Sequence, residues 1–217
     1  LEWGPIYLRN SNNKFENCLF EGNSFQGDGG VIQTYDANPE FINCTFSNNS
    51  CNGSGGAIFR NRGSLTLEGC SFTGNQAGNE GGAISGGGNM TNCTFTDNHA
   101  LFQGGAMHLE FGQIQECVFN NNSAGDGGAI SFPYYAIPTL DRCTFTGNTA
   151  ERGGALYHYD GKPRIQNSIF RANGQPYCLG GALFLEYKGR QSSDYDLEIY
   201  NNLFVENQAF DAALSFG

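Results

Sequence analysis

The chain has 217 residues, 32 glycines, few charged side chains and a net charge of −10. A negative chain disfavours nucleic acids and anionic lipid surfaces as partners, and no run approaches the roughly 18 apolar residues that span a bilayer. No amphipathic helical pattern is sustained over three turns, so the composition excludes an ordinary helical protein.

One motif recurs every 23 to 27 residues along most of the chain. Its first half is a glycine pair followed by a small and an aliphatic residue, at positions 29–32, 55–58, 81–84, 104–107, 127–130, 153–156 and 180–183. Its second half is a phenylalanine with an asparagine three residues later, and these phenylalanines are Phe20, Phe46, Phe72, Phe95, Phe119, Phe145, Phe170 and Phe204. Self-similarity at this period predicts stacked repeats.

In chain order, each repeat predicts two or three short strands separated by glycine or asparagine corners. An apolar residue stands five positions before every phenylalanine, and a small residue, cysteine in six repeats, stands two positions before it. Segments such as 93–95 are therefore predicted strands whose alternate side chains point into a core. The recurring asparagine predicts a ladder of side-chain amides that bond their own turn and the amide one coil away. The glycine tetrad then makes a tight corner and opens the next strand.

Strands of successive coils must pair in parallel because every coil runs the same way round. The sequence therefore predicts an all-β fold, a single-stranded right-handed parallel β-helix of about eight coils and, at ~4.8 Å per coil, a rod on the order of 40 Å long. We expect residues 1–217 to form one domain, either a segment of a longer chain or a filament subunit that stacks head to tail.

The repeat also explains the eight cysteines. Six share the inward position two residues before the phenylalanine, and Cys51 and Cys178 take the place of a small alanine. A buried free cysteine behaves as a small apolar side chain, so we predict no disulfides. A linear ladder of thiols cannot close around an ion, so we predict neither a metal site nor a cofactor.

The pairing of glycine tetrads with Phe-x-x-Asn segments resembles the repeats of the polymorphic outer membrane proteins of chlamydiae, and the likeness covers nearly the whole chain. In that family the repeats form the passenger of an autotransporter, a surface β-helix used in adhesion to host cells. The resemblance implies a secreted or cell-surface binding rod.

Outward positions on the strands after the tetrads hold the nearest approach to a functional site. The candidates are His108, Glu110, Tyr134, Tyr157, Tyr159, Asp160, Glu186 and Tyr187. Exposed tyrosines with nearby carboxylates suit a sugar ring or a protein surface, while cross-strand pairing that stabilises the sheet is the alternative interpretation. No outward column stacks two carboxylates beside a base on consecutive coils, so catalysis is not predicted.

Six N-x-Ser/Thr sequons are candidate glycosylation sites, at Asn43, Asn48, Asn52, Asn89, Asn92 and Asn121. The abundance of asparagine and threonine at fixed repeat positions is the alternative origin of these sequons.

Three functions fit the sequence. The first is an extracellular or cell-surface rod that binds a protein or a glycan. The second is a structural subunit of a filament or stalk that associates end to end, and the third is a polysaccharide-active enzyme. Nucleic-acid binding and direct membrane insertion are not expected.

Overall fold

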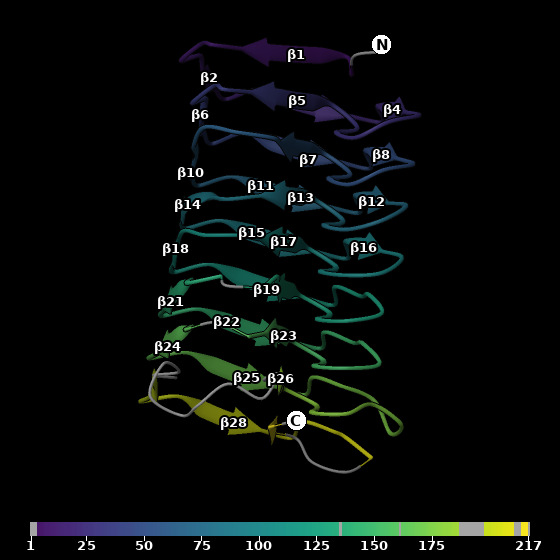
Figure 1. Cartoon of the computed structure of the whole chain (residues 1–217), viewed down its shortest axis with the longest axis vertical. Coiled ribbons are helices and arrows are strands. Elements are labelled where there is room, and N and C mark those ends of the chain that lie inside the picture. The colour runs from purple at the N-terminus through teal and green to yellow at the C-terminus, as the bar shows by residue number, and fades with distance from the viewer. Residues whose placement is uncertain (1–3, 135, 161, 187–197, 211–213, 217) are drawn as a thin grey trace.

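The molecule is a stack of coils that advances from the N-terminus to the C-terminus (Figure 1). The computed structural model describes residues 4–134, 136–160, 162–186, 198–210 and 214–216. Every element of regular secondary structure in this part of the chain is a β-strand, and strands of successive coils pair in parallel. The predicted all-β parallel β-helix is therefore confirmed.

Each coil gives one strand to each of three long sheets. Sheet A contains β1 (Ile6–Arg9), β5 (Ile32–Tyr35), β9 (Ile58–Arg60), β13 (Ile84–Gly86), β17 (Met107–Leu109), β20 (Ile130–Phe132), β23 (Leu156–Tyr159), β26 (Leu183–Glu186) and β29 (Leu214–Phe216). Sheet B contains β2 (Lys14–Glu16), β6 (Glu40–Ile42), β10 (Leu65–Glu68), β14 (Gly88–Thr91), β18 (Gln113–Gln115), β21 (Thr139–Asp141), β24 (Arg164–Gln166) and β27 (Glu198–Tyr200). Sheet C contains β3 (Leu19–Glu21), β7 (Thr45–Ser47), β11 (Ser71–Thr73), β15 (Thr94–Thr96), β19 (Val118–Asn120), β22 (Thr144–Thr146), β25 (Ile169–Arg171) and β28 (Leu203–Val205).

A fourth sheet lies on loops that project from the stack, on the right of Figure 1. Sheet D contains β4 (Ser24–Phe25), β8 (Ser50–Cys51), β12 (Gln76–Ala77) and β16 (His99–Ala100). We name residues 24–29, 50–55, 76–81, 99–104, 123–127, 149–153 and 174–180 the D loops, because each leaves sheet C and returns to sheet A at a glycine tetrad. Isolated parallel bridges join successive D loops at Glu80, Gln103, Asp126, Arg152 and Leu179. The D loops therefore form a continuous wall along the rod.

The core is a set of in-register ladders. From Phe46 to Phe170, successive phenylalanine ring centroids lie 4.6–4.9 Å apart and their planes differ by no more than 6°. These rings are fully buried, and burying each one contributes about 1.5–3 kcal/mol. The apolar residues five positions earlier pair in the same way along sheet B, as Phe41 with Leu67 and Leu67 with Met90.

The asparagines form a continuous ladder of amides. The Asn98 Nδ2 donates to Asn122 Oδ1 and to the Phe72 carbonyl, both at 3.0 Å. The same amide-to-amide bond links Asn23, Asn49, Asn75, Asn98, Asn122, Asn148, Asn173 and Asn207. The predicted ladder is confirmed, but inside the stack its backbone partner is a phenylalanine carbonyl of the preceding coil. Among the described residues, the expected bond to the asparagine's own turn is present at Asn23, whose Nδ2 donates to the Glu21 carbonyl at 3.3 Å. In the coils that follow, this expectation is wrong, because the buried amide donates to a carbonyl of the neighbouring coil instead.

The two glycines of the tetrad are required for different reasons. The first has a positive φ, for example 63° at Gly81, which other residues rarely adopt. The second has no space for a side chain, since a Cβ on Gly82 would lie 2.0 Å from the Gly105 carbonyl oxygen of the next coil. The tetrad is therefore a point of close backbone approach between coils.

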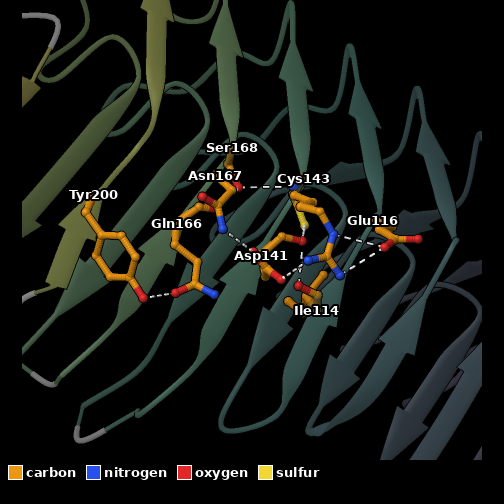
Figure 2. Close-up of polar contacts among 9 residues, drawn as sticks. Ile114, Glu116, Asp141, Cys143, Gln166, Asn167, Ser168 and Tyr200 are labelled. Carbon is orange, nitrogen blue, oxygen red and sulfur yellow. Dashed lines mark hydrogen bonds and ion pairs between the residues drawn. The ribbon is translucent and has the colours of Figure 1, made fainter.

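All eight cysteines are free thiols, and seven of them are buried while Cys18 is half-buried. Figure 2 shows Cys143, whose thiol donates to the Ile114 carbonyl at 3.4 Å and whose backbone N–H donates to Ser168 Oγ at 3.0 Å. Ser168 takes the cysteine position in the next coil, so this column holds small side chains that also bond the backbone. Cys51 pairs in register with Ala77, as predicted.

Candidate functional site

The outer face of sheet A carries the predicted outward columns. Strand register pairs His108 with Ser131 and Ser131 with Tyr157. The D loops cover this column, and Ser131 and Tyr157 are only 0% and 4% exposed. The prediction that Tyr157 is an exposed residue is therefore wrong, because strand alternation cannot reveal that another segment covers the ring.

Tyrosine side chains line a hollow on this face, which we name the tyrosine groove. Its volume is about 260 Å³, and its lining is Gln103, Phe132, Pro133, Tyr134, Tyr157 and Tyr159. The ring centroids of Tyr134 and Tyr159 lie 5.8 Å apart with an interplanar angle of 44°. Tyr134 is 42% exposed. Two aromatic rings from successive coils are thus available at the surface beside an amide from a D loop.

A network centred on Arg152 borders the tyrosine groove. Arg152 donates two hydrogen bonds of 2.8 and 2.7 Å to Asp126 and one of 3.1 Å to Glu186. The Tyr157 hydroxyl donates to the same Glu186 oxygen at 3.0 Å, and the Arg152 guanidinium lies 4.8 Å from the Tyr157 ring centroid. The bond to Asp126 raises the pKa of Arg152, and burial raises the pKa of Tyr157. Arg152 is therefore charged and Tyr157 protonated at neutral pH.

Sequence reasoning missed Asp126 and Arg152, although a signal for them exists. Each directly precedes a glycine tetrad, as do Glu80 and Gln103. Aligning the repeats on the tetrad, instead of on the phenylalanine, places these residues in one column, and the bridges between D loops confirm that column. The spacing between the two halves of the motif varies, so alignment on the phenylalanine hides it.

His108 lies between a serine and a carboxylate. A hydrogen bond of 2.8 Å joins its Nδ1 to Ser131 Oγ, and its Nε2 lies 3.5 Å from Glu80 Oε2. Burial lowers the pKa of His108, although Glu80 and Glu110 act in the opposite direction, so the imidazole is neutral at pH 7. Ser131 is fully buried, so a substrate cannot reach its hydroxyl. The arrangement pairs polar groups beneath the D loops.

Glu110 is engaged elsewhere. It forms an ion pair with Arg60, which is buried and belongs to a coil two turns earlier. Arg60 occupies the same inward position along sheet A that Leu109 occupies two coils later. Its side chain passes over Gly86 in the coil between them, where an added Cβ would lie 2.8 Å from Arg60 Nε. The guanidinium also lies 4.8 Å from the Phe111 ring centroid. Glu110 therefore neutralises a buried charge instead of extending the groove.

Two further predicted patch residues do not join the groove. Asp160 is fully buried after β23, and its carboxylate oxygens have no hydrogen-bond partner among the described residues. The prediction that Asp160 lies on an exposed patch is wrong, because it continues the inward alternation of that strand. Tyr187 lies outside the described residues. Of the predicted patch, the structure brings together Tyr134, Tyr157, Tyr159 and Glu186.

The asparagines of all six sequons are exposed, and these are Asn43, Asn48, Asn52, Asn89, Asn92 and Asn121. Four of them occupy corners with a positive φ, at Asn43, Asn48, Asn92 and Asn121. Their side chains are accessible to modification, and glycosylation at these positions stays a prediction.

In the part of the chain that the structure describes, no three histidine, cysteine or acidic side chains gather closely enough to hold a metal ion. That part also contains no helix with the length and apolar character needed to cross a membrane.

The stacked parallel sheets, the in-register ladders and the corner glycines define the class of the protein as a β-solenoid. A family model described as a right-handed β-helix region matches residues 3–128 and 83–216. The chain belongs to this right-handed β-helix family, which also confirms the predicted handedness. No curated protein and no solved structure matches the chain.

Proposed function

We propose that this chain is a non-enzymatic binding rod displayed outside the cell, and that its tyrosine groove binds a glycan. The observation that carries the proposal is the pair of Tyr134 and Tyr159 rings, 5.8 Å apart beside a hollow of about 260 Å³. Sugar rings have C–H faces that stack on aromatic faces, and their hydroxyls then bond to polar groups at the border of the site.

The polar border of the groove suits the same ligand. Glu186 is held by both Arg152 and Tyr157, and Gln103 contributes an amide to the lining. Because Glu186, Arg152 and Tyr157 are already fixed by their mutual bonds, binding a sugar beside them costs little additional side-chain entropy.

The carboxylates on this face support binding more than catalysis. Glycoside hydrolysis uses two carboxyl groups, one of which must protonate the leaving oxygen. Asp126 and Glu186 both bond to Arg152, and Glu110 is paired with Arg60. All three acids are therefore already engaged in ion pairs with arginines, which favours a binding role over a catalytic one.

Display outside the cell is supported by the repeat, whose tetrads and Phe-x-x-Asn segments resemble the adhesive passengers of chlamydial polymorphic outer membrane proteins. Free cysteines are compatible with an oxidising exterior here because seven of the eight are buried in the coils. We propose the same adhesive role for this rod.

Calorimetric titration of the purified chain with a panel of soluble oligosaccharides tests the proposal. Replacing Tyr134 and Tyr159 together by alanine is expected to weaken binding at least about tenfold, since two stacking contacts are lost. Tyr177→Ala is the matched control, because this D-loop tyrosine is 86% exposed and lies outside the groove. Equal losses in the control, or no binding of any glycan, contradict the proposal, and release of shorter products would favour the enzyme alternative.

A further inference from the structure

A second hollow on the same face is lined by residues of β1 and β5. These strands lie at the N-terminal end of the stack in Figure 1. The hollow has a volume of about 260 Å³, and its lining is Tyr7, Arg9, Gln33, Thr34, Tyr35 and Asn61. Arg9 and Tyr35 are paired in register. The hollow shares no lining residue with the tyrosine groove, so the two sites are separate.

Two guanidinium groups lie near the Tyr35 ring at cation–π distances. The Arg9 Cζ lies 5.6 Å and the Arg62 Cζ 5.7 Å from the Tyr35 ring centroid. Arg9 belongs to the coil before Tyr35 and Arg62 to the coil after it, so the two cations are separated by two coil spacings, roughly 10 Å. The aromatic ring attracts both cations and limits where their charges lie.

These two arginines differ from most of the others in their partners. The arginines that form ion pairs are Arg60, Arg142, Arg152 and Arg164. Within the described residues neither Arg9 nor Arg62 pairs with a carboxylate, and Asp36, next to Tyr35, pairs with neither of them. Both arginines are exposed, so their N–H donors are available to a ligand. The net charge of −10 hardly weakens the attraction of an anion to these two arginines, since salt screens exposed charges beyond about 8 Å.

Polar groups without partners also line this hollow. Thr34 is fully buried, and its hydroxyl oxygen has no hydrogen-bond partner among the described residues. The buried Oε1 of Gln33 is in the same situation. The Thr34 side chain points into the core, in register with Arg60, so its hydroxyl is not offered to a ligand, whereas the Gln33 amide lies on the outward side of β5 and can bond to one.

We propose that this hollow binds an acidic glycan, with a carboxylate or sulfate oxyanion on Arg9 and sugar hydroxyls on Gln33 and Asn61. A guanidinium donates paired N–H groups in the geometry that such oxyanions accept. Arg62, further along the rod, takes another anionic group of the same polymer. The proposal does not depend on the tyrosine groove.

Fluorescence anisotropy with two labelled probes distinguishes the oxyanions: oligogalacturonate carries carboxylates and a heparin oligosaccharide carries sulfates. Replacing Arg9 and Arg62 together by glutamine is expected to weaken binding of the preferred probe at least about tenfold. Arg171→Gln is the matched control, because Arg171 is exposed on sheet C and has no ion pair among the described residues; its binding should change less than about twofold. Replacing Tyr134 and Tyr159 should leave binding of short probes at this hollow unchanged.

A second pair of substitutions, Arg9→Lys with Arg62→Lys, keeps the charge and removes the paired N–H geometry, and it is expected to give an intermediate loss. Failure of both probes to bind the unaltered chain overturns the proposal, as does an equal loss with Arg171→Gln. Labelled polyglutamate that binds as tightly as the preferred glycan also overturns it, because attraction would then depend on charge alone.

Discussion

The asparagine ladder predicts a large effect of a single buried amide on stability. Asn98→Ala removes the bonds that Asn98 Nδ2 donates to Asn122 and to the Phe72 carbonyl. It also removes the acceptor of the Asn75 backbone N–H, at 3.0 Å, and of the Asn75 Nδ2, at 2.9 Å. The Asn75 N–H is left unpaired in a buried corner, and two oxygens each lose a donor. At about 1–3 kcal/mol for each buried group left unsatisfied, the free energy of unfolding should fall by about 3–5 kcal/mol.

Urea denaturation followed by circular dichroism measures this loss. Asn120→Ala is the matched control, because Asn120 is a half-buried residue on the outward face of β19. Its effect should stay within about 0.5 kcal/mol. Similar shifts for the two variants would contradict this prediction, since the ladder would then contribute no more than a surface amide. Because coils couple mainly to their neighbours, a broader transition in Asn98→Ala is also expected.

Three further predictions concern the glycines and the thiols. Gly82→Ala should lower the free energy of unfolding by about 3 kcal/mol or more, because the added Cβ meets the backbone of the next coil. Gly22 has a φ of 65° and open space around it, so Gly22→Ala should lose only about 1–2 kcal/mol. Thermal melts of the two variants measure this difference. Alkylation of the native chain followed by mass spectrometry should label Cys18 alone, and unfolded chain should take eight labels with or without reductant. Burial raises the pKa of Cys51 to about 11 and that of Cys143 to about 12 from an ordinary 9.0, so the folded chain keeps protons that the unfolded chain releases. The free energy of unfolding is therefore at its full value below pH 9 and falls as pH rises towards 11–12, by about 1.4 kcal/mol per thiol per pH unit. Urea midpoints across that range test the sign, and a rising midpoint would contradict it.

The sequence predicted the ladders because equivalent residues recur in every coil. Once Phe95 and Asn98 are aligned with their counterparts, parallel in-register stacking follows from the common direction of the coils. What lies outside the ladders was harder to predict. Alternation along β23 correctly places Tyr157 outward, but burial of its ring depends on a D loop that sheet periodicity does not describe. The Arg60 side chain reaches Glu110 two coils away only because residue 86, in the coil between them, is a glycine with no side chain in its path. The contact therefore depends on three residues in three different repeats, which the repeat pattern does not predict.

The two proposed sites occupy one outward column of sheet A, with Tyr35 near one end and Tyr159 near the other. They are five coil spacings apart, or about 24 Å at ~4.8 Å each. A short oligosaccharide can therefore occupy only one site, whereas a longer acidic polymer can bind both, and linkage then raises its apparent affinity without any new contact. If the rod works in this way, affinity should increase with chain length in the unaltered protein and lose that dependence when either site is removed. Combining the arginine and tyrosine substitutions should then be additive for short ligands and non-additive for long ones.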